Sequence, residues 1–256
     1  MTDLEFASLN TTGDITRLTM RRAPLNFFNL DMLQHMQRLL EGLGESPPGR
    51  VLVIDSDGAA FCAGLDLAEH TRQGVFLLLD QYHTFVRLVS TFPRPTIALV
   101  RGMALGAGNE LAASCDYVIA SHNATFGQPE IKIGTMPSLA PLLLPLRIGF
   151  QRAIQMILTG NPVDAQEAAR IGLADRTVRE EEMETALERW IADLRGSPVP
   201  VMELALRCAR GARNRELETG LSEIQSLYWN ELMDLDEPIE GVRAFLEKRA
   251  PRWSGK

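Results

Sequence analysis

The amino-acid sequence predicts an α/β protein with a largely parallel sheet, and three observations support this fold class. Apolar runs that suit strands buried on both faces occur at 51–54, 96–100 and 117–120. Segments with helical spacing of apolar residues lie between such runs. Each run is followed by a turn-rich stretch, at 56–64, 101–108 and 121–134. Ligands in such folds bind at the carboxyl ends of strands, so these stretches are the candidate site.

The remaining elements follow in chain order. Residues 4–9 and 14–20 predict an N-terminal hairpin with its turn at 11–13. Apolar residues at helical spacing from Asp31 to Leu43 predict a helix, which the glycines and prolines at 42, 44, 47 and 48 end. After Pro137 strand signals nearly vanish, and helices are expected from residues 183, 201, 216 and 238, with a break at 196–198. We therefore expect an α/β core over 1–195 and a helical segment over 196–256, whose apolar faces bury on the core or on another subunit.

Composition narrows the function classes. The chain has 256 residues, 45% of them hydrophobic, and a net charge of −7, which excludes a disordered or collagen-like protein. The acidic balance argues against nucleic-acid binding through bulk charge. Two local basic clusters could still bind phosphates: Arg207, Arg210, Arg213 and Arg215, and Lys248, Arg249 and Arg252. The first cluster is more typical of a solvated helix face.

The cysteines and the apolar segments indicate a soluble protein of a reducing compartment, the cytoplasm. Cys62, Cys115 and Cys208 lack the spacing of a disulfide framework or a zinc site, and the first two suit small core positions. The N-terminus has no apolar signal-peptide core. The longest apolar stretch, 139–146, contains two prolines and is far shorter than a membrane span.

Three segments place special residue types just after predicted strands. In residues 60–66, a glycine permits a turn, Leu65 is expected to offer its N–H at the start of the next helix, and Asp66 suits that helix's N-cap. Small residues at 106–108 open a second helix, whose N–H groups favour an anion, with Glu110 in or near its first turn. Glu130 lies in an apolar run where a solvated side chain is not expected.

These motifs, with others in the same order, resemble the crotonase (enoyl-CoA hydratase/isomerase) superfamily, and most closely an enoyl-CoA hydratase. The matching segments are 63–66, 106–111 with Cys115 and Asp116, 126–130, 158–160 and 245–249. The resemblance spans nearly the whole chain. It implies a crotonase-like core of ββα units arranged in a spiral, a helical C-terminal trimerisation segment, and a homotrimer or dimer of trimers.

The resemblance also implies the catalytic groups. The family holds the thioester oxygen with two backbone N–H groups, which match Leu65 and Ala107 here; Ala107 replaces the usual glycine but keeps its N–H. Hydration of the C2–C3 double bond of a 2-enoyl-CoA uses two glutamates, matched by Glu110 and Glu130. We assign Glu110 to deprotonating the water and Glu130 to protonating C2, although the roles are interchangeable. One carboxyl should have a raised pKa.

Coenzyme A is expected to enter only as part of the acyl-CoA substrate, and no metal or other cofactor is expected. The family's CoA contacts match Arg22, Ala23, Leu25, Ala63, Leu65, Asp66, Leu67, Phe245 and Lys248. A basic residue usual two positions after Asp66 is replaced by Ala68. The phosphates are therefore assigned to Arg22, Arg72 or Lys248.

A second departure concerns the acyl group. Where common short-chain hydratases have a glycine-rich run, this chain has an apolar segment at 138–145, with Phe27 and Phe28 early and Tyr228 and Trp229 late. This pattern is similar to that of hydratases of alicyclic dienoyl-CoA thioesters, but ordinary repacking around the acyl pocket explains it as well. The sequence is also compatible with an enoyl-CoA isomerase of the same family, or with a noncatalytic, RNA-binding member that uses the arginines at 207–215.

Overall fold

The computed structural model describes residues 6–69, 74–212, 230–231, 234–237, 240–241, 244 and 247–255. The chain divides into two compact units, Met1–Glu188 and Arg189–Lys256. The division falls within helix α7 (Met183–Leu194), and so slightly earlier than the expected boundary after residue 195.

Among the described residues, the larger sheet has six strands in the order β1-β2-β3-β5-β7-β10. It confirms the hairpin, the three predicted buried strands and the largely parallel layout. Within the described part of this sheet, β1 and β2 pair antiparallel and the other neighbouring strands pair parallel. The turn of the hairpin lies at 13–14, slightly later than expected. The strands are β1 (Ala7–Thr12), β2 (Ile15–Met20), β3 (Val51–Ser56), β5 (Thr96–Val100), β7 (Tyr117–Ser121) and β10 (Arg176–Val178).

A second sheet corrects the expectation that strands are followed only by turns. Its order is β4-β6-β8-β9, and it comprises β4 (Ala60–Cys62), β6 (Met103–Leu105), β8 (Thr125–Gly127) and β9 (Val163–Asp164). The first three follow β3, β5 and β7 directly, so each turn-rich stretch contains a strand. Strands of three residues are too short to show alternation in the sequence. Paired ββ units of this kind agree with the ββα arrangement that the resemblance implies.

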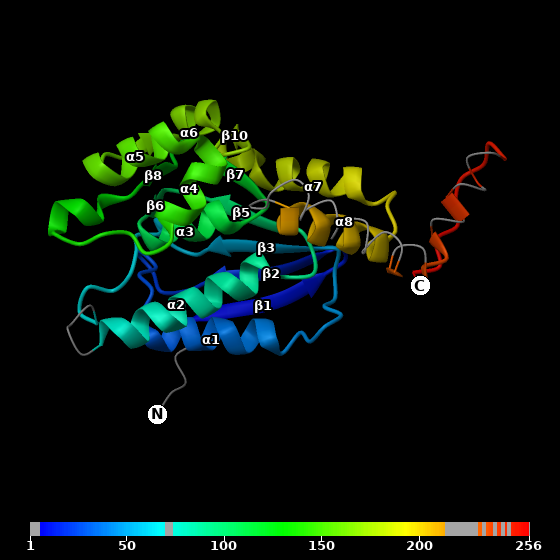
Figure 1. Ribbon diagram of the computed structural model, residues 1–256, viewed down its shortest axis with the longest axis horizontal. Helices are drawn as coiled ribbons and strands as arrows, with labels where there is room; N and C mark the ends of the chain where they lie inside the picture. Colours follow the sequence, from blue (N-terminus) through cyan, green and yellow to red (C-terminus); the bar gives the residue numbers. More distant parts are fainter. Residues whose placement is uncertain are drawn as a thin grey trace. The chain divides into compact units, whose positions relative to one another are not determined.

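Helices follow these strand pairs, and Figure 1 shows α1 and α2 running side by side below the larger sheet. Helix α1 begins where Asn29 accepts a hydrogen bond from the Met32 amide at 3.0 Å. Phe28, Tyr82 and Phe85 form an aromatic cluster in the core nearby. The helices are α1 (Leu30–Glu41), α2 (Val75–Ser90), α3 (Ala107–Ser114), α4 (Ala140–Ile148), α5 (Phe150–Thr159), α6 (Ala165–Ile171), α7 and α8 (Val199–Ala212), with 3-10 turns η1 (Pro129–Ile133) and η2 (Glu180–Glu182).

The second unit is held by its own contacts. The Trp253 indole N–H donates to the Gly196 carbonyl at 2.8 Å. Buried Glu237 accepts hydrogen bonds from the Ser254 hydroxyl and the Gly255 amide. The break at 196–198 and the helix expected from 201 are confirmed, although α8 already begins at Val199. The helix expected from 216 begins outside the described residues, and much of the one expected from 238 lies there as well.

Close packing of α3 on β4 requires a glycine at position 108. A Cβ there would lie 2.1 Å from the Cys62 carbonyl oxygen. No real Cβ tolerates that distance to a backbone atom, so α3 and β4 would have to separate. Because α3 carries Glu110, this contact also sets the position of a candidate catalytic residue.

We expect Gly108→Ala to destabilise the chain by about 3 kcal/mol or more, at the upper end of typical overpacking costs. Gly196→Ala is the matched control, because a Cβ at Gly196 meets nothing within 4 Å. Urea unfolding of both variants measures the difference. Equal stability of the two variants would show that α3 can move away from β4 freely.

Candidate active site

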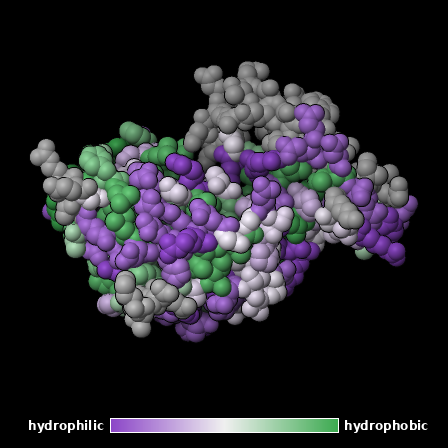
Figure 2. Space-filling model, turned by 90° about the horizontal axis from the view of Figure 1, so that it is seen from below, coloured by the Kyte–Doolittle hydropathy of each residue, from purple (hydrophilic) through white to green (hydrophobic). Residues whose placement is uncertain are grey.

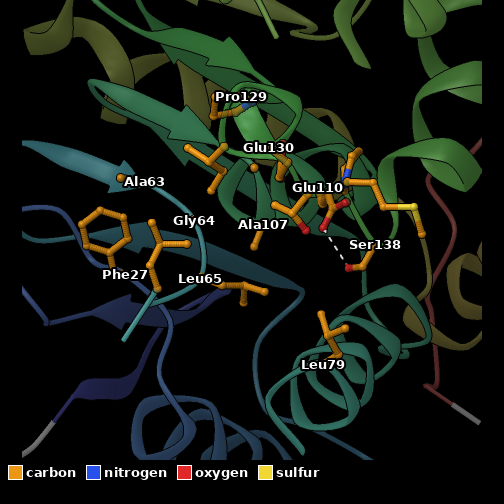
Figure 3. Close-up of a pocket in the computed structure, with 16 residues that line it drawn as sticks. Phe27, Ala63, Gly64, Leu65, Leu79, Ala107, Glu110, Pro129, Glu130 and Ser138 are labelled. Carbon is orange, nitrogen blue, oxygen red and sulfur yellow. Dashed lines mark hydrogen bonds between the residues drawn. The ribbon is translucent and has the colours of Figure 1, made fainter. Parts of the chain in front are cut away.

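A cavity of about 370 Å³ lies in the first unit, at the carboxyl ends of β4, β6 and β8. The cavity lies at the strand ends where the sequence predicts the ligand site. Three stretches form most of the cavity wall: residues 63–67, the start of α3, and residues 129–138. Figure 3 shows Glu110 and Glu130 next to each other near Ala107. The lining residues are Phe27, Ala63, Gly64, Leu65, Leu67, Leu79, Gly106, Ala107, Glu110, Pro129, Glu130, Ile133, Thr135, Met136, Pro137 and Ser138.

The start of α3 depends on Gly106. Its φ of 54° is the left-handed region that favours glycine, and a Cβ there would lie 2.6 Å from Glu130 Oε1. The glycine therefore lets the Glu130 carboxyl approach the helix start. Ala107 is the first residue of α3, so its N–H belongs to the amides that have no partner within the helix. The predicted helix start at 106–108, with Glu110 in its first turn, is confirmed.

Leu65 lies in a β-bridge with Phe28, and not at a helix start as expected. The bridge uses the Gly64 carbonyl and the Asp66 amide, which bond to Phe28 at 2.9 and 2.8 Å. In this pattern the intervening Leu65 N–H points away from Phe28. Leu65 and Ala107 both line the cavity.

Asp66 is not a helix N-cap, because the next helix, α2, begins only at Val75. One Asp66 carboxylate oxygen accepts the Ala68 amide at 3.1 Å, and the other pairs with Arg22 at 2.6 Å. The residue closes a local turn and fixes the loop that precedes α1. Its role is therefore to join the two predicted substrate-binding segments.

Glu110 is 1% exposed, and backbone amides compensate for its burial. Its Oε1 accepts hydrogen bonds from the Leu139 and Ala140 N–H groups, both at 2.7 Å, and its Oε2 faces the Ser138 hydroxyl at 3.5 Å. Burial raises the pKa of Glu110, while the two amides favour its ionised form. The start of α4 is thus attached directly to a carboxylate of α3.

Glu130 is the more accessible carboxyl. Burial raises the pKa of Glu130 to about 7; a backbone hydrogen bond opposes this shift, and the nearby charge of Glu110 adds to it. The buried Gln128 amide, oriented so that its neighbours are satisfied, donates to both Glu130 oxygens at 3.1 and 3.2 Å and accepts from Asn109. The direction of this shift agrees with the expectation that one carboxyl of the pair has a raised pKa. Gln128 is a residue that the sequence pattern did not indicate.

Tyr82 of α2 contacts the first turn of α3. Its buried hydroxyl donates to the Ala107 carbonyl at 2.8 Å, which joins α2 to the first turn of α3. Burial, followed by the neighbouring Glu110 charge, raises the Tyr82 pKa well above its usual value. The hydroxyl therefore stays protonated and remains a donor.

A second residue absent from the sequence predictions, Asn26, anchors the loop between β2 and α1. Its side chain is fully buried; the amide nitrogen donates to the Asp57 and Ala60 carbonyls at 2.7 and 2.8 Å. Its amide oxygen accepts the Arg22 N–H at 2.8 Å. These contacts hold the loop against the strand that leads into the cavity.

The structure brings most of the expected CoA contacts together. The Ala63 amide donates to the Leu25 carbonyl at 2.9 Å, so the stretches around both residues lie side by side. Arg22 and Ala23 belong to the loop between β2 and α1. The Arg22 guanidinium donates to the Asp66 carboxylate and to the Phe27 carbonyl. Leu67 lines the cavity and is 58% exposed. Lys248 is exposed in a turn of the second unit, and Phe245 and Arg72 lie outside the described residues.

The apolar segment at 138–145 contributes to the cavity through its first residue. Ser138 lines the cavity, whereas Ala140 and Leu144 of α4 are buried in the core. Of the aromatic residues expected near the acyl pocket, Phe27 lines the cavity. Phe28 does not, because it is fully buried in the core cluster, and Tyr228 and Trp229 lie outside the described residues.

The other features considered in the sequence do not form a site among the described residues. Arg207 pairs with Glu231, Arg210 lies on α8, and Arg213 and Arg215 fall outside the described residues. In the part of the chain that the structure describes, no three His, Cys, Asp or Glu side chains cluster as metal ligands would. No helix within that same part is long and apolar enough to cross a membrane. Figure 2 shows several hydrophobic patches among polar residues on the face it draws.

One buried and one half-buried carboxyl lie beside the start of α3 in an apolar cavity, an arrangement suited to proton transfer next to a polarised oxygen. Known proteins agree with this chemistry. The sequence profile of the Enoyl-CoA hydratase/isomerase family matches residues 10–256, and the chain belongs to this family. The predicted crotonase-like fold is thereby confirmed.

Particular relatives point the same way. The chain is 33% identical to a cyclohexa-1,5-dienecarbonyl-CoA hydratase from Thauera aromatica, over 97% of this chain and 96% of that protein. It is 34% identical to a probable enoyl-CoA hydratase from Mycobacterium bovis, over 91% of each chain. The crystal structure of an enoyl-CoA hydratase from Bacillus anthracis superposes with a TM-score of 0.91 at 28% identity, covering 98% of this chain and 100% of that one.

The raised pKa of Glu130 predicts a pH-dependent stability difference. The folded pKa of about 7 exceeds the roughly 4.3 expected for an unfolded glutamate. Glu130 therefore ionises less readily in the folded chain than in the unfolded one, and the free energy of unfolding falls as pH rises from about 4.3 to about 7. We expect Glu130→Gln to raise Tm relative to the parent at pH 8 and to change it little at pH 5.

Calorimetry of both chains at the two pH values checks this. Glu41→Gln, at an exposed position on α1, is the control for the loss of one surface carboxylate. If Glu130→Gln shifted Tm equally at pH 5 and pH 8, Glu130 would ionise as readily in the folded chain as in the unfolded one.

Proposed function

We propose that this chain is an enoyl-CoA hydratase that adds water across the C2–C3 double bond of a 2-enoyl-CoA thioester. The observation that carries the proposal is the pair Glu110 and Glu130, which line one apolar cavity beside the start of α3. Hydration needs one group to remove a proton from water and another to deliver a proton to carbon. An isomerase needs only one such group, so the pair favours the hydratase.

The thioester oxygen would bind to the N–H groups of Leu65 and Ala107. Both residues line the cavity, and neither N–H is used by the backbone contacts that hold its segment. When the double bond is attacked, negative charge develops on this oxygen. A backbone N–H placed at such an oxyanion contributes about 3–4 kcal/mol to transition-state stability, and the positive end of α3 adds to the effect.

The two carboxyls then have complementary roles. Glu110, ionised, takes a proton from water as the water oxygen bonds to C3, and the π electrons move to the thioester oxygen. The enolate then returns its electron pair to C2, which takes a proton from the neutral Glu130. The raised pKa of Glu130 supports its role as the acid, and the two amides on Glu110 support its role as the base. The product has gained one water, and a proton moves from Glu110 to Glu130 to restore the site.

The CoA portion would bind along the two stretches that the structure joins. Arg22, Ala23 and Leu25 provide one side, and the backbone of Ala63 to Leu67, Asp66 included, provides the other. Phe245 and Lys248 are proposed to contact the nucleotide, in line with the family resemblance. Because CoA arrives with the substrate, this reaction uses no separate cofactor.

We also infer a homotrimer or a dimer of trimers in the cytoplasm. Exposed apolar side chains on consecutive elements of the first unit support the assembly. They are Ile131, Leu142, Leu146, Phe150 and Leu158, which are 41–63% exposed. Isolated surface leucines are ordinary, but a series of this kind is typical of a contact face.

A hydratase of an alicyclic dienoyl-CoA thioester is the second candidate. Two observations favour it: the apolar segment that begins at Ser138 in the cavity wall, and the similarity to the Thauera enzyme along nearly the whole chain. An RNA-binding role is less well supported, because Arg207 is paired with Glu231 and both glutamates of the cavity are retained.

We expect Glu110→Gln and Glu130→Gln each to lower kcat for hydration of crotonyl-CoA by about 10²- to 10⁴-fold, because each removes one proton transfer. KM should change little, since Gln keeps the shape of the side chain. Loss of absorbance of the conjugated thioester measures the rate. Glu41→Gln is the matched control, and a near-normal rate in either cavity variant would reject the two-carboxylate mechanism.

The substrate class is tested by comparing straight-chain 2-enoyl-CoA esters with cyclohexadienoyl-CoA in the same assay. We expect efficient hydration of at least one set. Faster turnover of the linear esters supports the first candidate, and activity confined to the cyclic diene supports the second. Conversion of a 3-enoyl ester with little hydration of the 2-enoyl ester would contradict both and favour an isomerase.

A further inference from the structure

The two oxygens of the Glu110 carboxylate have different environments. Oε1 accepts two short hydrogen bonds, from the Leu139 and Ala140 amides. Oε2 faces the Ser138 hydroxyl, and the nearby Tyr82 hydroxyl donates to the Ala107 carbonyl. A carboxylate oxygen that already accepts two amides is a poor base. Oε2 is therefore the oxygen suited to take a proton in the cavity.

The spacing between Oε2 and the Ser138 Oγ suits a shared water. Their separation of 3.5 Å is long for a direct O–H···O bond, which is usually about 2.5–3.0 Å. A water molecule placed about 2.8 Å from each of these two oxygens could hydrogen-bond to both at ordinary distances. Glu110 and Ser138 both line the cavity, and Figure 3 shows them facing each other at its edge.

We propose that Ser138 is a positioning residue that holds the nucleophilic water against Glu110 Oε2. This inference rests on the proposed hydratase function. The water donates one O–H to Oε2 and the other to Ser138 Oγ, which leaves an oxygen lone pair directed into the cavity. In the reaction the first O–H bond breaks, its proton passes to Glu110, and the water oxygen bonds to C3. Ser138 keeps its own hydrogen throughout.

The backbone makes this arrangement rigid. The residues that follow Ser138 donate their amides to Oε1 of the same carboxylate, so the Ser138 backbone cannot move away from the carboxylate without breaking two bonds of 2.7 Å. Ala140 is fully buried and begins α4. The serine therefore belongs to a fixed frame around Glu110. Its hydroxyl also lowers the Glu110 pKa, in opposition to the larger effect of burial.

Two reactions catalysed at the same site distinguish a loss of water positioning from a general disturbance of the active-site geometry. Hydration of crotonyl-CoA needs the nucleophilic water. Exchange of the C2 protons of butyryl-CoA in D₂O needs only the oxyanion donors and Glu130. We expect Ser138→Ala to lower kcat for hydration about 10- to 100-fold with KM within about twofold, while the exchange rate stays within about twofold of the parent.

Ser138→Thr restores a hydroxyl and should recover most of the hydration rate. Ser90→Ala, which removes a hydroxyl bonded within α2, is the matched control. Equal losses of hydration and exchange in Ser138→Ala would overturn the proposal, because they would show a displaced Glu110 frame. Unchanged hydration would overturn it as well. If the parent chain exchanged C2 protons but hydrated no 2-enoyl ester, the proposed hydratase function itself would be rejected.

Discussion

The contact between the Glu110 carboxylate and the first amides of α4 is the interaction on which the site depends. An ionised carboxyl that is 1% exposed needs hydrogen-bond donors, since an uncompensated buried charge costs several kcal/mol. Here the donors come from residues 139 and 140, far along the chain. The same two bonds therefore stabilise the charge, place α4 beside α3, and set the cavity wall at Ser138.

A second constraint is the electrostatic conflict at the start of α3. The helix start favours a negative charge on a bound oxygen, but the cavity already contains two carboxyls whose negative charges would repel it. Burial moderates the conflict by raising the Glu130 pKa to about 7, so that near neutrality this carboxyl is often uncharged. Gly106 is needed because any side chain there would occupy the position of the Glu130 carboxyl. The site thus combines an oxyanion donor with a neutral acid, at a cost in stability that is common in active sites.

Local patterns were sufficient for the main architecture. The buried strands β3, β5 and β7 have continuous apolar runs, and the helix at 106–108 is marked by small residues. The second sheet was missed because its strands have two or three residues. The start of α2 was misplaced because Gly64 and Asp66 imitate a helix start. Gln128, Asn26 and Ser138 were missed because their roles depend on contacts with residues distant in sequence, which no local pattern contains.

The cavity wall has a consequence for evolvability. Residues 133 and 135–138 of the lining come from one continuous stretch that runs from the last residue of η1 to the start of α4, whereas Gly106 and the amides of Leu65 and Ala107 come from other segments. Ile133 and Met136 in this stretch are 58% and 77% exposed, so their replacement disturbs little of the core. Such a wall allows acyl preference to diversify through changes at positions 133 and 136, while Glu110 on α3 and Glu130 on η1 are retained.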